Sequence, residues 1–433
     1  MGKLFKPLFA TQASQYAVNC VYLLVASLWL HFAEKSVIAF LMLLFSFLVL
    51  YYSDKIPNKI RIIVGALIFL VLLPFATGAN PYYMEVSSNV GIYVAMALGL
   101  NIVVGFAGLL DMGYVAFFAA GAYSYAIFAT AQANKFIPTS VMQFPLSGGW
   151  FWLFLLVGLV VAATFGILLG LPVLKVKGDY LAIVTLGFGE IVRIVFNNLD
   201  HPINITNGPR GLPAITQPQL FGMTLNTPLH YYYLVLIVIA FIILVNKRLE
   251  NSRLGRAWIA IREDELAAQA MGIPLVKTKL MAFATGASFA GIVGVIFAAK
   301  QTFVDPTSFI LMQSISILVM VILGGSGSVP GVIVGGAIIT VLNVQVLQEI
   351  SQWMNELSMS GIVNIPSELD PSKFQRLIFG VILICIAIFR PSGIIPAKRP
   401  AIDIERIKEL DKTLPQTGIL GKMGTVQDGR KEA

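Results

Sequence analysis

The sequence predicts an all-α, polytopic membrane bundle of about 10–12 transmembrane helices, with some helices broken or re-entrant at glycine-rich segments. Hydrophobic residues make up 57% of the 433 residues, against about 45–50% in soluble domains, and charged residues make up 12%, against about 25%. Apolar runs close to the length of a membrane span recur along the chain. So few charges cannot cover a soluble surface, and this composition argues against nucleic-acid binding despite the net charge of +8.

The apolar runs define about twelve candidate spans, taken in chain order. They cover residues 16–30, 37–52, 60–75, 89–106, 114–130, 150–171, 180–196, 231–245, 280–299, 310–323, 332–347 and 374–389. Glycines interrupt the regions 99–121 and 324–336, so we expect broken or re-entrant helices there, and the count could fall to about ten or eleven. The first run follows Lys3 and Lys6 and is expected to be an uncleaved span rather than a signal peptide.

Basic residues are distributed unevenly between the two sides of these spans. Of the 30 Lys and Arg, 23 fall on the side that holds both termini and only 5 on the other side. Because basic residues concentrate in cytoplasmic loops, both termini are predicted to be cytoplasmic and the number of spans to be even. The loop 246–279 is then cytoplasmic, and the loops 197–230 and 349–373 are external.

Three regions are expected. Residues 1–85 form an N-terminal extension with about three spans, residues 86–393 form the core, and residues 394–433 form a polar cytoplasmic tail. No phosphate-binding loop, metal-ligand spacing or catalytic triad occurs in the sequence, so no enzyme activity and no cofactor are expected in this chain. Cys20 and Cys385 lie in apolar runs and are interpreted as small buried hydrophobic residues.

Glu190 and Arg193 are the ionisable pair inside one predicted span. They lie three residues apart on one helical face, so they can pair with each other and orient the helix. A direct contact with a permeating solute is the alternative, because ionisable residues within spans often mark transport paths. A secondary transporter driven by an ion through Glu190 is therefore the second functional hypothesis.

The cytoplasmic loop is predicted to contain one amphipathic helix. Its apolar stripe is formed by Leu254, Trp258, Ile261, Ala268 and Met271. Asn251 or Ser252 can cap its start, and Gly272 followed by Pro274 ends it. The charged side chains Arg256, Arg262, Glu263, Asp264 and Glu265 are expected to be solvated. Such a helix fits docking into a groove on another protein, and a helix lying on the membrane surface with Trp258 at the interface is the alternative.

Five strings together resemble the LivM-type permeases of bacterial ATP-binding-cassette importers for branched-chain amino acids. They are GLLDMGYVAFFAAGAYSYA (108–126), KGDYLAIVTLGFGEIVRIVFNN (177–198), NITNGPRGL (204–212), NSRLGRAWIAIREDELAAQAMGI (251–273) and ILGGSGSVPGVIVGGAII (322–339). In their order and spacing they cover the chain from about residue 87 to residue 393, and the extra N-terminal spans also match this subunit.

This resemblance implies a permease of the bacterial inner membrane that pairs with a LivH-type permease and two cytoplasmic ATPases. A periplasmic binding protein would deliver Leu, Ile or Val, and the ATPases would hydrolyse ATP. The family's coupling loop falls on residues 252–273, with the candidate contacts Ser252, Leu254, Gly255, Arg256, Trp258, Ile261, Ala268 and Gly272. The family's Glu-Ala-Ala…Gly pattern is matched only loosely, by Glu265, Ala267, Ala268 and Gly272. Other amino acids, urea or amides remain alternative substrates.

The expected helix breaks supply the candidates for the translocation path. With the charged pair they are Gly108, Asp111, Glu190, Arg193, Gly324 and Gly325. Close helix packing is the alternative for the glycines, and the Gly-x-x-x-Gly spacing of 166 and 170 and of 327, 331 and 335 fits it. In the external loop, Asn207 and Arg210 are candidate contacts for the binding protein, and a tight turn with a solvated arginine is the alternative.

Overall fold

The computed structural model describes residues 12–32, 37–53, 55–78, 80–138, 143–173, 176, 178–359 and 374–397. Over these residues it confirms the predicted all-α membrane bundle: eight helices are long and apolar enough to cross a membrane, and two shorter apolar helices accompany them. All twelve predicted spans overlap helical segments. The predicted tail lies outside the described residues from residue 398 onward.

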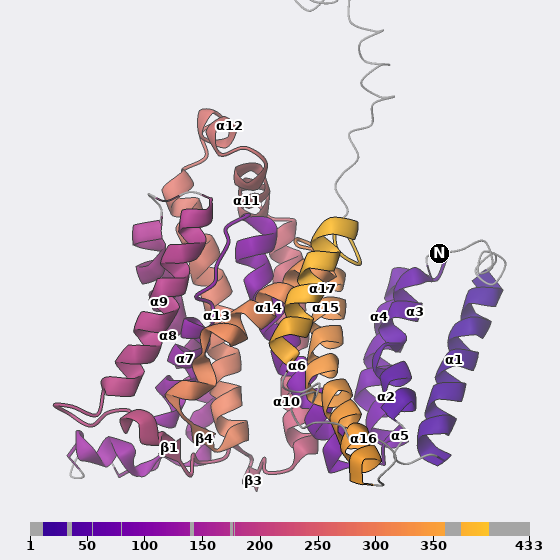
Figure 1. The fold of residues 1–433 in the computed structure, drawn as a ribbon, viewed down its shortest axis with the longest axis horizontal. Helices are drawn as coiled ribbons and strands as arrows, with labels where there is room; N and C mark the ends of the chain where they lie inside the picture. Colours follow the sequence, from indigo (N-terminus) through magenta and orange to yellow (C-terminus); the bar gives the residue numbers. More distant parts are fainter. Residues whose placement is uncertain are drawn as a thin grey trace, which may run out of the picture. The chain divides into compact units, whose positions relative to one another are not determined.

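The N-terminal helices are uneven in length (Figure 1). They are α1 (Gln12–Phe32), α2 (Val37–Leu44), α3 (Ser46–Tyr52), α4 (Asn58–Leu67), the π-helical turn η2 (Ile68–Leu72) and α5 (Leu73–Ala76). Pro74 lies within the last of these. Because proline has no backbone N–H, it cannot satisfy the carbonyls one turn before it, and the helix adopts the π-turn there.

Five long helices build the core. They are α6 (Pro81–Leu100), which continues into the π-turn η3 (Asn101–Phe106), α8 (Phe151–Val173), α9 (Asp179–Asn198), α10 (Pro228–Glu250) and α13 (Leu275–Gln301). Sequence signals fix the starts of α6 and α10. The side chain of Asn80 accepts from the backbone N–H of Tyr82 and caps α6, and the side chain of Thr227 accepts from the backbone N–H of His230 and caps α10. Proline at the first position of each helix agrees with these caps.

Glycines allow α13 to pack closely between α7 (Val115–Ala126) and α8. A Cβ on Gly291 would lie 2.2 Å from the carbonyl oxygen of Gly158, and one on Gly121 would lie 2.2 Å from that of Gly291. The backbones of three helices therefore meet at these positions, and a side chain at any of them would separate the helices. The packing interpretation also holds for Gly166, whose Cβ would lie 2.8 Å from Ala287.

The two predicted breaks are present. The first separates η3 from α7, and the second separates α14 (Leu311–Gly324) from α15 (Val329–Val341). Helix α15 continues through the π-turn η8 (Leu342–Val346) into α16 (Leu347–Met359). The last described helix is α17 (Gln375–Phe389). At 12 and 14 residues, α7 and α14 are about 18 and 21 Å long, too short to cross a hydrocarbon core of about 30 Å. Their N-terminal turns meet, and the backbone N–H of Val115 donates to Ser314 Oγ at 3.0 Å.

Short elements close one end of the bundle. The strand β1 (Leu212–Pro213) pairs with β4 (Phe303–Val304), and β2 (Gln219–Leu220) pairs with β3 (Met223–Thr224), both antiparallel. The 3-10 turns are η4 (Ala131–Lys135), η5 (Gly148–Trp150), η6 (Gly208–Arg210) and η7 (Pro306–Phe309). At the opposite end of Figure 1 lie α11 (Arg253–Glu263) and α12 (Glu265–Ala270). The cytoplasmic and external loops predicted from charge therefore lie at opposite ends.

The prediction that the two cysteines are buried is wrong. Cys20 on α1 and Cys385 on α17 are both exposed on the surface of this chain. Hydrophobicity alone cannot distinguish burial against protein from exposure to lipid, because both environments favour apolar side chains.

Candidate translocation and coupling site

The loop 246–279, predicted to be cytoplasmic, forms two helices rather than the single helix predicted. Ser252 caps α11, with Oγ accepting from the N–H of Gly255 at 3.1 Å. The chain then breaks at Asp264, whose carboxylate accepts from the N–H groups of Leu266 and Ala267 and so caps α12. A short acidic side chain satisfies backbone donors better at a helix start than inside a helix. The predicted end is confirmed, because Gly272 has a positive φ of 83°.

The apolar stripe of α11 faces the chain's own core. Trp258 is fully buried, and its indole Nε1–H donates to the carbonyl oxygen of Thr278 at 2.8 Å; Ile261 is buried beside it. Gly255 permits a close approach, since a Cβ there would lie 2.1 Å from the carbonyl oxygen of Leu249 on α10. These residues fasten α11 to α10 and α13. A helix with Trp258 at the membrane interface is contradicted, and any coupling through Trp258 and Ile261 is indirect.

The outer face of the loop carries other apolar side chains. Leu266 is 71% exposed and Met271 is 84% exposed, whereas Ala268 is buried. On the inner side, Lys279 Nζ lies 2.7 Å from Glu265 Oε1 and joins α12 to α13. Leu254 is half-buried and Arg256 is exposed. Of the predicted stripe, Trp258, Ile261 and Ala268 are buried in this chain and Leu254 is half-buried, whereas Met271 lies on the exposed face.

Arg262 is a residue that the sequence analysis missed. Instead of being solvated, it is half-buried, and Nη1 donates to the carbonyl oxygen of Gly105 in η3. A Cβ on Gly108 would lie 2.7 Å from Arg262 Cγ, and one on Gly327 would lie 3.0 Å from Nη1. Arg262 thus reaches both helix breaks from α11. Its position four residues after Trp258, on the same face as the buried stripe, was the available signal.

Asn101 joins the two breaks directly. Its Oδ1 accepts from the backbone N–H of Gly327 at 2.8 Å, and the side chain is fully buried. The approach is tight, because a Cβ on Gly105 would lie 2.0 Å from Asn101 Oδ1 and 2.5 Å from the nitrogen of Gly327. Arg262, Asn101 and the glycines of both breaks therefore form one contact region, which we call the junction.

The candidate path glycines of the second break belong to a packed turn. A Cβ on Gly324 would lie 2.2 Å from the carbonyl oxygen of Gly331, and Gly325 has a positive φ of 119°. The backbone N–H of Ile395 donates to Gly324 O at 3.0 Å and holds this turn against the segment after α17. Close packing and backbone conformation account for both glycines, while their place beside the junction fits a hinge.

Asp111 lies in the first break and is fully buried. Its Oδ1 accepts from the N–H of Gly113 at 2.9 Å, but its Oδ2 has no partner among the described residues. The adjacent backbone is fixed, because the N–H of Met112 donates to Thr185 Oγ1 on α9 at 3.0 Å and the hydroxyl of Tyr114 donates to Gly286 O on α13 at 3.0 Å. A buried carboxylate oxygen without a partner is costly, which makes it a candidate for contact with a solute.

The predicted pairing of Glu190 with Arg193 is confirmed. Arg193 Nε lies 2.8 Å from Glu190 Oε2, and each side chain is 31% exposed. The pair is therefore only partly covered by this chain. It shares α9 with Thr185, which contacts the first break one turn earlier.

The two external-loop candidates differ in accessibility. Asn207 has a positive φ of 63°, and its Nδ2 donates to Gly211 O at 2.9 Å, so its side chain stabilises the turn. Arg210 ends η6 and is exposed. The structure therefore leaves Arg210 as the accessible candidate of the two.

A buried charge at this end was also missed. The side chain of Lys300 on α13 is only 3% exposed, and Nζ lies 2.8 Å from Glu85 Oε1 and 2.6 Å from Asn89 Oδ1, both on α6. Glu85 and Asn89 lie four residues apart on one face of an otherwise apolar span, and this spacing was the available signal.

Comparison with known proteins identifies the class of this bundle. The family described as "Branched-chain amino acid transport system / permease component" matches residues 82–387. This chain belongs to that permease family. LivM, the high-affinity branched-chain amino acid transport system permease protein of Escherichia coli K12, is 35% identical over 367 residues, which cover 79% of this chain and 76% of LivM.

Other members of the permease family are more distant. A probable branched-chain amino acid transport permease protein LivM from Methanocaldococcus jannaschii is 26% identical over 332 residues, covering 71% of this chain and 91% of that protein. The autoinducer 2 import system permease protein LsrC of Klebsiella pneumoniae is 27% identical over 161 residues, covering 36% and 44%. No solved structure matches.

Membership of the permease family confirms the resemblance drawn from the five strings. The matched residues 82–387 contain both breaks, the junction and the coupling loop. The chain is a multi-pass membrane transport component and not an enzyme.

Proposed function

We propose that this chain is the membrane-spanning subunit of an ATP-binding-cassette importer that carries branched-chain amino acids across a bacterial inner membrane into the cytoplasm. The identity of 35% with LivM of Escherichia coli supports this substrate class. The family's description as the permease component of a transport system supports assembly with other subunits. We propose that these are a second, LivH-type permease, two cytoplasmic ATPases and a periplasmic amino-acid-binding protein. Both termini and the end that carries α11 and α12 are cytoplasmic, as the basic residues indicate.

The contact of Arg262 with both helix breaks is the observation that carries the mechanism. The ATPases bind the exposed face of α11 and α12, which includes Leu266 and Met271. ATP binding and hydrolysis in those subunits move the two helices. Because Arg262 donates to Gly105 O and contacts Gly327, this motion changes the angle between the segments on either side of each break. Broken helices suit such motion, since their unpaired backbone groups can line a wet path.

Asp111 contacts the solute during transport. Leucine, isoleucine and valine each carry an ammonium group, which a buried carboxylate can pair with. Oδ2 of Asp111 has no protein partner in the described part of the chain, and it lies in the first break beside the N-terminus of α7. Glu190 and Arg193 remain paired and orient α9. At the external end, the exposed Arg210 contacts the binding protein.

The substitution Asp111→Asn tests the solute contact. Asn keeps an oxygen that can accept from Gly113 and removes the negative charge, so insertion and folding are expected to persist. Loss of a charged pairing contribution of about 1.5–3 kcal/mol predicts an apparent KM for leucine uptake about 10- to 150-fold higher. Proteoliposomes with the full complex provide the assay, and Glu356→Gln, which neutralises an exposed carboxylate on α16, serves as the control with near-normal uptake. Unchanged KM in Asp111→Asn would contradict the contact.

A separate experiment tests the importer itself. Affinity purification of this chain is expected to recover a second permease and two ATPases, and leucine uptake is expected to require ATP and the binding protein. Uptake by this chain alone, driven by an ion gradient and lost in Glu190→Gln, would instead establish a secondary transporter. Competition by unlabelled valine, urea and amides would identify the substrate class.

A further inference from the structure

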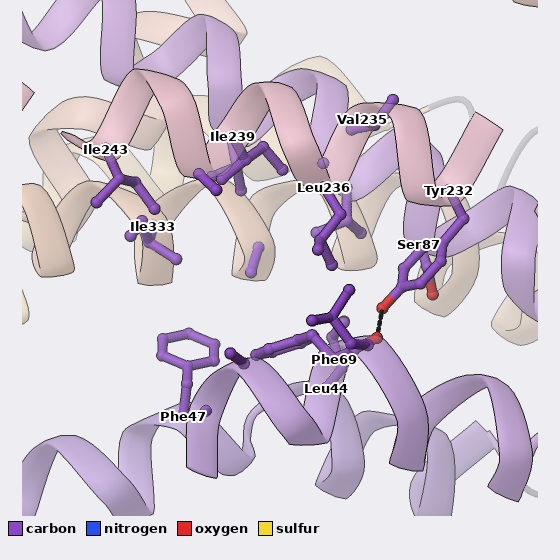
Figure 2. A pocket seen from close by; sticks show the side chains of 18 residues that line it. Leu44, Phe47, Phe69, Ser87, Tyr232, Val235, Leu236, Ile239, Ile243 and Ile333 are labelled. Carbon is purple, nitrogen blue, oxygen red and sulfur yellow. Dashed lines mark hydrogen bonds between the residues drawn. The ribbon is translucent and has the colours of Figure 1, made fainter. Parts of the chain in front are cut away.

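An apolar cavity of about 390 Å³ lies between the N-terminal helices and the core (Figure 2). One wall comes from α2, α3, α4 and η2, and the other from α6, α10 and α15. All of its 18 lining residues except Ser87 and Tyr232 are apolar. Figure 2 shows Phe47 on one wall facing Ile239 and Ile243 across the open space. An apolar cavity of this kind holds no stable water.

Two hydrogen bonds join the walls at the end of the cavity near Tyr232 and fix the distance between α10 and η2. The hydroxyl of Tyr232 donates to Phe69 O at 2.5 Å, and that of Tyr233 donates to Leu70 O at 3.1 Å. Both carbonyls are available because Pro74 has no N–H. Residue 74 would otherwise donate to Leu70 O in an α-helix and to Phe69 O in a π-helix. The two tyrosines therefore clamp η2 to α10 at a fixed separation. The gap beyond the clamp is left unfilled by side chains.

The position and length of the cavity match one leaflet of a bilayer. On α10 it extends from Tyr232 to Ile243, twelve residues with a rise of about 16 Å, which is about half the thickness of a hydrocarbon core of about 30 Å. Most of its lining residues belong to helices long and apolar enough to cross a membrane. The cavity opens to the surface of the chain beside Leu70, which is 42% exposed, and beside the exposed Ala66 and Ala240. A helix about 10–12 Å across would need several times this volume over the same length. The occupant must be slender and apolar.

One polar side chain without a hydrogen-bond partner in the described part of the chain lines the cavity. Ser87 is 5% exposed, lines the cavity, and its Oγ has no partner among the described residues. The neighbouring Ser88 behaves differently, because its Oγ donates to Met84 O one turn earlier at 2.7 Å. Ser87 lies six residues after Pro81, about 9 Å from the start of α6, close to the depth at which lipid head groups meet the hydrocarbon.

We propose that this cavity is a binding site for one acyl chain of a phospholipid. The chain enters from the leaflet at the N-terminal end of α10 and lies along Leu236, Ile239 and Ile243. On binding, the covered Ser87 hydroxyl turns into the cavity and donates to the ester carbonyl at the top of that acyl chain. The bound chain fills the space that the two tyrosines hold open, so the lipid completes the contact between the N-terminal helices and the core.

Photolabelling in proteoliposomes tests the site. The probe is phosphatidylethanolamine with a diazirine on one acyl chain, incorporated with the complete importer. Peptides with residues 236–243 are expected to be labelled more strongly than peptides around Leu156 and Val160 on α8, which are 61% and 59% exposed and serve as the ordinary lipid-facing control. The mass of each adduct identifies the phospholipid, as opposed to a free fatty acid.

Variants that fill the cavity make the test specific. A Cβ on Gly65 would be 4.0 Å from its nearest neighbour, Leu50, so Gly65→Phe can place a ring in the space. Labelling of 236–243 is expected to fall to the level of α8, and Ala240→Phe does the same from the opposite wall if Gly65→Phe does not accumulate. Ser87→Ala is expected to weaken competition by unlabelled phospholipid about fivefold, whereas Ser88→Ala leaves it unchanged.

Two results would overturn the proposal. The first is equal labelling of α8 and the cavity, with no effect of either filling variant. The second is a cross-link from a photoreactive residue at Ala240 to another protein subunit in place of the lipid. Neither result depends on transport activity, so the site is tested independently of the proposed function.

Discussion

Replacing Arg262 with alanine is expected to uncouple ATP hydrolysis from transport. The substitution removes the donor to Gly105 O and the contact with Gly327, while the buried Trp258 continues to hold α11 in place. A hydrogen bond from a charged donor contributes about 1.5–3 kcal/mol, equivalent to about a 10- to 150-fold change in an equilibrium between two conformations. Leucine transported per ATP hydrolysed should fall by a factor in this range, because α11 then moves without carrying the breaks with it.

The assay measures leucine uptake and ATP hydrolysis in the same proteoliposomes, and co-purification measures the retention of the ATPases. Arg256→Ala is the control for loss of an ATPase contact: Arg256 lies on the same helix, is exposed, and donates to Asn251 O at 2.9 Å, so its loss can lower recovery of the ATPases but should leave the ratio of transport to hydrolysis unchanged. Arg262→Lys keeps the charge with a shorter reach and should restore transport in part. A normal ratio of transport to hydrolysis in Arg262→Ala, or an equal loss in Arg256→Ala, would refute the role of the junction.

Three further experiments test other parts of the structure. Leu266→Asp combined with Met271→Asp should reduce recovery of the ATPases about tenfold or more without changing thermal stability in detergent, since both side chains are exposed; normal recovery would place the contact elsewhere. Trp258→Ala should lower the free energy of unfolding by about 3–5 kcal/mol, seen as a lower midpoint in thermal denaturation, and an unchanged midpoint would contradict its burial. Gly291→Leu should prevent accumulation of folded protein in membranes, whereas Gly187→Leu, at an open position, should not.

The spans and breaks could be predicted because they depend on local composition. Each apolar run corresponds to a helical segment, although α7 and α14 are too short to cross the membrane alone, and the glycines grouped around Asp111 and after Leu323 mark the breaks. The helix end at Gly272 and the pairing of Glu190 with Arg193 were equally local, since each depends on spacing within one element. These predictions needed no knowledge of how helices pack.

The direction of side chains relative to other helices could not be predicted. The stripe containing Trp258 showed that one face of α11 is apolar, but periodicity does not say whether that face meets the same chain or a partner. Arg262 was interpreted as a solvated charge because its acceptor, Gly105, is 157 residues away. The same applies to Lys300 and Glu85, which lie on separate spans. Asp264 is a different case. Its role as the N-cap of α12 depends on local sequence, but the same sequence is also compatible with one continuous helix through Asp264.

The two faces of the loop 246–279 make different contacts. In the proposed mechanism, this difference allows a motion of the bound ATPases to reach the membrane-spanning helices. The inner face is fixed by groups that resist displacement: the indole of Trp258 bonded to Thr278 and the ion pair between Glu265 and Lys279. Both partners are near the start of α13, so a force on the outer face reaches that helix through short contacts. Arg262 adds a second route, because it bypasses α13 and contacts both breaks. Packed interfaces switch between discrete arrangements instead of deforming continuously. In the proposed mechanism, a displacement that changes the partner of Arg262 would therefore act on both breaks together.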